Sequence, residues 1–233
     1  MSLKARWMAL LVVASWCAAT GLAQSTQPAA GDDEGEEVVY RPPSQGASKA
    51  RMGGGSRAGV KMPTIEALVP EESGTTLSAT PVLYWFCSEP SELQAEFSLV
   101  DATTLDTLKR VKLAHPIAAG WQAVDLSKIG VGLEPGVAYE WRVAVIAGTG
   151  KAGDNAVAGG MIQRAGAEAG VPLDSGNAVR RAARLAAAGV WYDAVQELMR
   201  DIDRDPAARK ALAGLLAQVK LKAAAEHAAK LAG

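Results

Sequence analysis

The sequence predicts an α+β protein in which an antiparallel β-sandwich is followed by a short helical region. Over residues 63–165, short runs of strand-forming residues alternate with turn residues such as Glu134-Pro135-Gly136. Beyond residue 165 the chain becomes rich in alanine, and its apolar residues recur at helical spacing. The predicted segments are a signal peptide over 1–23, a flexible linker over 24–62, a β-sandwich domain over 63–165 and an α-helical region over 166–233.

The strand pattern is typical of an immunoglobulin-like or fibronectin-III-like sandwich. In AYEWRVAV, Tyr139, Trp141 and Val143 share one face of a strand, and Glu140 and Arg142 share the other. Seven such strands within about 100 residues are what this architecture requires. The expected strands are residues 64–69, 82–87, 93–100, 107–113, 121–126, 138–147 and 156–163.

The most specific local signal in the β region is LEPGVAYEW, residues 133–141. A Leu-x-Pro-Gly turn leads into a strand with an early tyrosine, which predicts a tyrosine corner at Tyr139. The Tyr139 hydroxyl would then bond to nearby backbone, a structural role. The alternative is that Tyr139 or Trp141 stacks against a ligand.

Four helices are expected, over residues 177–188, 191–203, 206–219 and 222–231. The stretch RLAAAGVWYDAVQELMRDIDRDP resembles a tetratricopeptide unit, with Gly189 between two helices and Pro206 after the second. Because such arrays need about three repeats to stand alone, we expect these helices to pack on one another and partly on the sandwich.

The first 23 residues have the three parts of a secretory signal peptide. Lys4 and Arg6 precede an uncharged apolar run over 7–20, and small residues end the segment at Ala23. The run is shorter than the roughly 20 residues that span a bilayer, so cleavage and no stable membrane span are expected. An uncleaved anchor and lipidation at Cys17 are the alternatives. The protein is therefore predicted to be periplasmic or extracellular.

The residues beyond the signal peptide favour neither a disulfide nor a nucleotide site. Cys87 would be the one cysteine left, and its apolar surroundings favour a buried thiol over an intermolecular bridge. The linker stretch RMGGGSRAG follows no strand and lacks the lysine and hydroxyl of a phosphate loop. A formal net charge of −1 for the whole chain gives no basic field for nucleic acid.

Few residues offer catalytic chemistry. His115 and His227 have no cysteine pair beside them at zinc-site spacing, and no G-x-S-x-G motif is present. We therefore assign no catalytic, cofactor-binding or metal-binding residue. A hydrolase that uses two loop carboxylates is the less favoured alternative. Its candidates are Glu71, Glu72, Glu89 and Glu92.

The order of several short motifs resembles one known family. GGGSR is followed by PTIEALVPEESGTTLSATPVLYWF, AEFSLVD, LEPGVAYEWRVAV, GGMIQR and GVWYDAV. This order resembles the domain-of-unknown-function 928 family of secreted bacterial proteins, over roughly residues 51–220. The family has no established activity, substrate or catalytic residues, so the resemblance favours an envelope-associated role and assigns no catalytic residue.

Together these features predict an exported, non-enzymatic protein-interaction or scaffold module of the cell envelope. Its partner would be another envelope protein or a surface polymer, and its first expected contacts are Trp191 and Tyr192 on the second helix. The alternative is a carbohydrate-binding module of the envelope. Its stacking platform would be Trp85, Trp121 or Trp141.

Overall fold

The computed structural model describes residues 37–43, 52–54, 61–149, 151–166, 171 and 176–233. The predicted signal peptide, and with it Cys17, lies outside these residues. So does most of the predicted linker. All described residues fall within one compact unit, in which the sheets and the helices pack together. The helical region is therefore part of the same unit as the β region.

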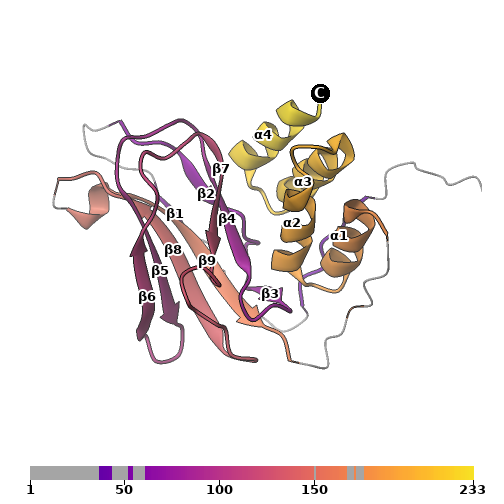
Figure 1. Ribbon diagram of the computed structural model, residues 1–233, viewed down its shortest axis with the longest axis horizontal. Coiled ribbons are helices and arrows are strands. Elements are labelled where there is room, and N and C mark those ends of the chain that lie inside the picture. Colours follow the sequence, from indigo (N-terminus) through magenta and orange to yellow (C-terminus); the bar gives the residue numbers. More distant parts are fainter. Residues whose placement is uncertain (1–36, 44–51, 55–60, 150, 167–170, 172–175) are drawn as a thin grey trace, which may run out of the picture. The chain divides into compact units, whose positions relative to one another are not determined.

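Two β-sheets are built from the strand-forming runs of the sequence (Figure 1). The larger sheet has the order β1 (Met52–Gly54), β9 (Ala156–Arg164), β8 (Ala138–Val145), β5 (Ala95–Asp101) and β6 (Thr107–Lys112), and β3 (Gly74–Thr76) pairs with β9 in parallel. The smaller sheet has the order β2 (Ile65–Ala67), β4 (Val82–Cys87) and β7 (Gly120–Asp125). All strand pairs except β3 with β9 are antiparallel.

Alternating side chains explain how β5 and β8 bury one face. Phe97 lies opposite Val143 and Leu99 opposite Trp141, and all four side chains are buried. On the other face Ser98 lies opposite Arg142. The buried residues of both sheets belong to a single hydrophobic cluster, so one core holds the two sheets together.

The sequence did not predict β3, which consists of Gly74, Thr75 and Thr76. These residues carry no large apolar side chain, so no periodic signal marks them. The strand forms because its backbone pairs with β9, and Thr76 is fully buried there. A Cβ atom on Gly74 would lie 2.8 Å from Cε2 of Tyr192, so this close approach requires a glycine.

The four expected helices are α1 (Ala178–Ala187), α2 (Trp191–Arg200), α3 (Pro206–Gln218) and α4 (Lys222–Ala232), and a short 3₁₀ turn, η1, spans Ala152–Asp154. Polar side chains fix two of their starts. The Asn177 side chain accepts a hydrogen bond from the Arg180 amide at 2.9 Å, and Asp205 accepts one from the Ala207 amide at 2.8 Å. Together the sheets and helices confirm the predicted α+β class.

Part of the predicted linker packs against the helices. Val38 is buried, and the Gln218 side chain bonds to this segment twice, accepting from the Tyr40 amide and donating to the Val38 carbonyl. The Arg41 amide donates to the Ala186 carbonyl at 3.0 Å. The segment 37–43 therefore differs from the flexible linker expected there, because partners far along the chain satisfy its backbone.

None of the helices in the described part of the chain combines the length and apolar character needed to cross a membrane.

Candidate functional site

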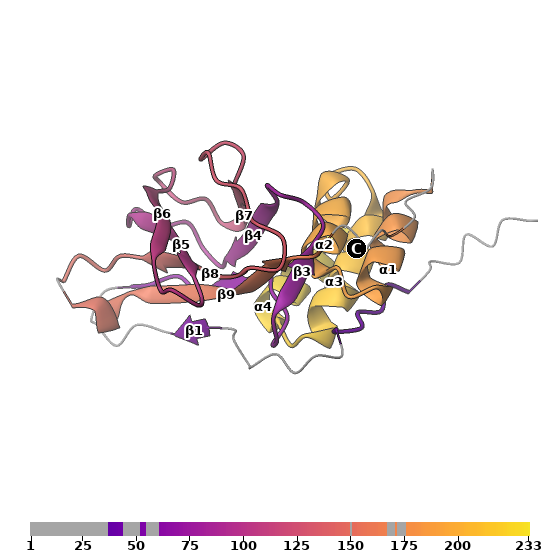
Figure 2. The same cartoon turned by 90° about the horizontal axis from the view of Figure 1, so that it is seen from below.

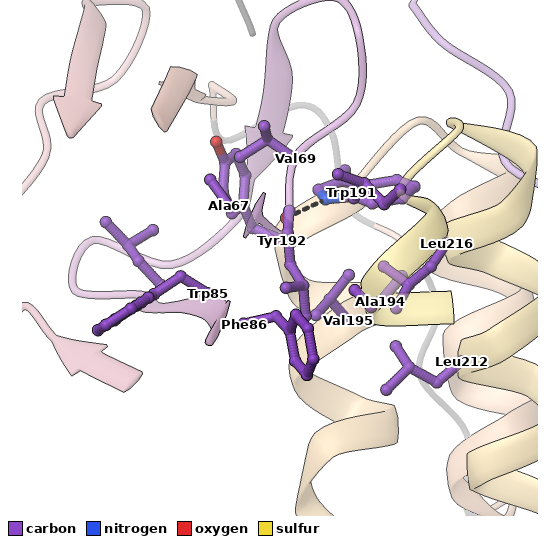
Figure 3. Packing of buried hydrophobic residues seen from close by; sticks show 14 of the residues in the cluster. Ala67, Val69, Trp85, Phe86, Trp191, Tyr192, Ala194, Val195, Leu212 and Leu216 are labelled. Carbon is purple, nitrogen blue, oxygen red and sulfur yellow. Dashed lines mark hydrogen bonds between the residues drawn. The ribbon is translucent and has the colours of Figure 1, made fainter. Parts of the chain in front are cut away.

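Helix α2 lies against the sheets beside β3 and β4 (Figure 2), and Trp191 anchors its first turn. The Trp191 side chain is 0% exposed, and its Nε1 donates a hydrogen bond to the Leu68 carbonyl at 2.8 Å, the dashed line in Figure 3. Its ring also meets Tyr40 edge to face, with centroids 4.8 Å apart. Trp191 therefore joins the helices, the end of β2 and the segment 37–43.

Tyr192 makes a second buried polar link between α2 and the large sheet. Its hydroxyl donates to the Met161 carbonyl and accepts from Nε1 of Trp141, each at 2.9 Å. Burial raises the pKa of Tyr192, which keeps this hydroxyl protonated as a donor. Next to it, Asp193 accepts from the Leu77 amide at 3.1 Å, and burial raises the pKa of this carboxyl.

The expectation that Trp191 and Tyr192 contact an outside partner is wrong. Both side chains are buried, at 0% and 2% exposure, and their polar atoms already have partners inside the protein. The helical spacing of the apolar residues correctly predicted that this face of α2 is buried. In the structure, the protein's own sheets cover this face.

Replacing Tyr192 with phenylalanine is expected to lower the free energy of unfolding by about 1–3 kcal/mol. The change keeps the ring and leaves both Nε1 of Trp141 and the Met161 carbonyl without their partner. Chemical denaturation measures the loss, with Tyr84→Phe, at a partly buried tyrosine of β4, as the matched control. Equal stabilities for the two variants would contradict this role.

The three tryptophans of the alternative carbohydrate site do not form an exposed row. Trp85 and Trp141 are buried, at 2% and 0% exposure. Trp121 is partly buried and packs against Phe86 and His227, with ring centroids 5.6 Å and 5.0 Å away. Burial in this cluster lowers the pKa of His227, and the nearby charge of Lys230 lowers it further. A stacking platform built from these three side chains is therefore wrong.

Tyr139 lies where the corner motif of the sequence places it, at the start of β8. Its side chain is 2% exposed, and its hydroxyl oxygen accepts a hydrogen bond from the Glu134 amide at 3.2 Å. The bond ties the beginning of β8 to the turn that precedes it. Because the ring is buried, it offers no surface on which a ligand could stack.

The loop carboxylates of the alternative hydrolase lie in different settings. Glu89 pairs with Lys61, and Glu92 is exposed. Glu71 pairs with Lys220 at 3.0 Å and lies beside Glu72 at the edge of a cavity. Among the described residues no three side chains of the metal-binding kinds gather into a site.

Cys87 is buried, and its Sγ lies 3.1 Å from the Glu89 carbonyl oxygen, to which it donates. Burial raises the pKa of this thiol, so it stays protonated near neutral pH. This is the buried thiol that the sequence favoured, and at this depth it cannot reach a second chain.

A different surface, which the sequence did not single out, lies at β6. This strand ends the order of the large sheet, on the side away from the helices (Figure 1). The Leu113 amide donates to the Ala95 carbonyl at 2.9 Å. In the antiparallel register of β5 and β6, this bond fixes which amides of β6 face β5. By the alternation of such ladders, the amides of Arg110 and Lys112 point away from β5, to a side where no described strand pairs with β6.

The side chains around this edge are basic and apolar. Lys109, Arg110 and Lys112 lie within β6, and Arg110 forms an ion pair with Glu96 at 3.3 Å. Leu105 and Leu108 are 75% and 41% exposed. Leu105 also has a φ of 64°, a conformation that costs a bulky residue about 1–2 kcal/mol. We call β6 and the preceding Leu105 the β6 edge.

The fold and the β6 edge define an α+β protein whose large sheet ends, within the described part of the chain, in a basic strand. The family model described as Domain of Unknown Function (DUF928) matches residues 49–229. The chain therefore belongs to this family, as its motif order predicted.

Comparisons with other proteins add little. No curated protein matches the chain. An engineered protein of known structure is 10% identical, with a TM-score of 0.32, over 45% of this chain and 20% of its own. The C-terminal domain of wzt is 12% identical, with a TM-score of 0.28, over 57% of this chain and 89% of its own. The chain thus spans about a fifth of the engineered protein, and neither score supports an assignment.

Proposed function

We propose that this protein is an exported, non-enzymatic protein-interaction module of the cell envelope that binds an extended, acidic segment of a partner protein along the β6 edge. The observation that carries the proposal is the position of β6 at the end of the large sheet, with its residues largely exposed. An extended peptide can add to such an edge as a further strand, held by main-chain hydrogen bonds.

The charges of the edge favour an acidic partner over a second copy of the same edge. The edge strand carries three cations, Lys109, Arg110 and Lys112, of which Arg110 pairs with the Glu96 carboxylate. Two β6 strands placed side by side would bring like charges together, which disfavours pairing between copies. An acidic segment would instead gain charge-assisted contacts with the same side chains.

The exposed Leu105 and Leu108 supply apolar surface for a contact, and the backbone of Leu105 is strained in the unbound protein. Leu105 combines high exposure with a strained backbone, although a glycine would fit this turn without strain. Strain at an exposed apolar residue points to a role in binding. We therefore place Leu105 and Leu108 in the contact with the partner.

The sequence of residues 1–23 supports export, because it has the charged, apolar and small-residue parts of a signal peptide. The strand order supports an immunoglobulin-like or fibronectin-III-like sandwich. With the strands lettered in chain order, β2-β4-β7 are A-B-E and β6-β5-β8-β9 are C′-C-F-G. We assign Tyr139 as its tyrosine corner, and α1 with α2 as a single tetratricopeptide-like pair that supports the sheet.

The proposal is tested by titrating the protein with a short capped peptide of alternating glutamate and valine. The amide signals of β6 are followed by NMR. Arg110→Pro removes the side-chain charge and an outward-facing amide, a change that edge strands tolerate, and Arg110→Ala removes the charged side chain, with its ion pair to Glu96, but keeps the amide. We expect Arg110→Pro to weaken binding about tenfold and Arg110→Ala less, since the alanine keeps the hydrogen bond.

A lysine–valine peptide is the matched control and should bind weakly. Equal binding of the acidic peptide to all three proteins, or perturbations that avoid β6, would contradict the proposal. Unfolding curves of both variants establish that the fold is retained.

A further inference from the structure

A cavity of about 200 Å³ lies where three separated parts of the chain meet. The segment 37–43 contributes Tyr40 and Pro42 to the lining. The loop after β2 contributes Pro70, Glu71 and Glu72, and the residues at the end of α3 contribute Lys220. The proline rings give the cavity apolar walls, and the polar groups gather around them. No residue of β6 lines it.

The Tyr40 hydroxyl is buried in this region and has no hydrogen-bond partner among the described residues. Its backbone amide, in contrast, donates to the Gln218 side chain at 2.9 Å, and its ring packs against Trp191. Burial, with a smaller contribution from Glu72, raises the pKa of Tyr40 to about 12. Tyr40 therefore stays neutral near physiological pH and adds an uncharged wall to the cavity.

The charge of the cavity favours a cation. Glu71 is paired with Lys220, and Glu72 forms no ion pair with a described residue. The carboxyl end of α3, at Gln218, adds the negative end of a helix dipole. One carboxylate and the helix end are thus left to attract a positive group.

We propose that this cavity binds the primary ammonium group of a small aliphatic amine. The ammonium group donates to the Glu72 carboxylate, and the aliphatic stem lies against Pro42 and Pro70. The same ammonium chemistry occurs in soluble amines and in the ethanolamine headgroup of lipids. The site is independent of the proposed function, because it shares no residue with the β6 edge.

The test uses butylamine, which is protonated at neutral pH, and butanol, which has the same stem without the charge. Both are titrated into the protein while the amide signals of Glu72, Val219 and Lys220 are followed by NMR. Saturable changes are expected with butylamine, and butanol should give none at the same concentrations. No change with butylamine, or equal changes with the two compounds, would overturn the proposal.

Variants identify the groups that bind. Glu72→Gln keeps the shape of the side chain and removes its charge, and we expect it to weaken butylamine binding about tenfold or more. Glu92→Gln, at an exposed carboxylate, is the matched control and should bind like the unaltered protein. Equal affinity of the Glu72 variant and this control would overturn the assignment of Glu72.

Two further experiments are needed. The first distinguishes a soluble amine from a lipid headgroup, and the second distinguishes this site from the β6 edge. Binding to vesicles that contain phosphatidylethanolamine but not to phosphatidylcholine vesicles, lost in Glu72→Gln, would assign the site to the lipid headgroup. Binding of free butylamine alone would assign it to soluble amines. Arg110→Pro should leave butylamine binding unchanged, so failure at one site is distinguishable from failure at the other.

Discussion

Replacing Trp191 with alanine should lower the free energy of unfolding by about 3–5 kcal/mol. The change removes a fully buried ring and leaves the Leu68 carbonyl without its hydrogen-bond donor. It also removes the edge-to-face contact with Tyr40. Urea denaturation followed by circular dichroism measures the effect. The loss is a large part of the 5–15 kcal/mol that stabilises a typical domain.

Because such a variant could fail to fold, Trp191→Phe serves as a milder second variant. It keeps most of the ring contacts, loses the hydrogen bond to Leu68, and should cost about 1–3 kcal/mol. Leu108→Ala, at an exposed side chain, is the control and should change stability by no more than about 0.5 kcal/mol. If Trp191→Ala cost less than about 1 kcal/mol, the buried anchor would be contradicted.

Replacing Gly159 with alanine is expected to destabilise the large sheet by about 2–3 kcal/mol. A Cβ atom at this position would lie 2.2 Å from the Trp141 carbonyl oxygen and 3.0 Å from the Cα of Arg142. Both are backbone atoms of β8, so relief requires the paired strands to move apart. Thermal or urea unfolding of the variant measures the cost.

Gly214→Ala is the matched control, because its Cβ atom would meet nothing within 4 Å. Gly214 lies inside α3, where alanine should stabilise the helix by about 0.5–1 kcal/mol. The two glycine-to-alanine changes are thus expected to have opposite signs. A neutral or stabilising effect of Gly159→Ala would show that β8 and β9 do not approach as closely as described.

The fold was predictable wherever a periodic apolar pattern coincided with a complete element. The alternating residues of β8 identified its buried face, and the turn residues Glu134-Pro135-Gly136 marked where it begins. β3 had no such pattern. Its burial comes from pairing with β9 and from contact with Tyr192, which depends on tertiary structure alone.

The candidate sites were less predictable, because they depend on how distant segments meet. Periodicity marked Trp191 as part of a buried helix face but could not tell an internal sheet from an outside partner. Tyr40, Glu72 and Lys220 come together only after residues 37–43 dock on the end of α3. Likewise, residues 107–113 were predicted as a strand, yet its position at the edge follows from the strand order.

The most direct test of the proposed function is affinity recovery of partners from the native envelope with tagged protein. The unaltered chain, Arg110→Ala and Arg110→Pro are compared side by side, after each is shown to fold. We predict that a specific protein with an acidic segment is recovered by the unaltered chain and is lost with Arg110→Pro, while Arg110→Ala retains part of it. Recovery of the same protein in equal amount by all three would contradict binding along the β6 edge.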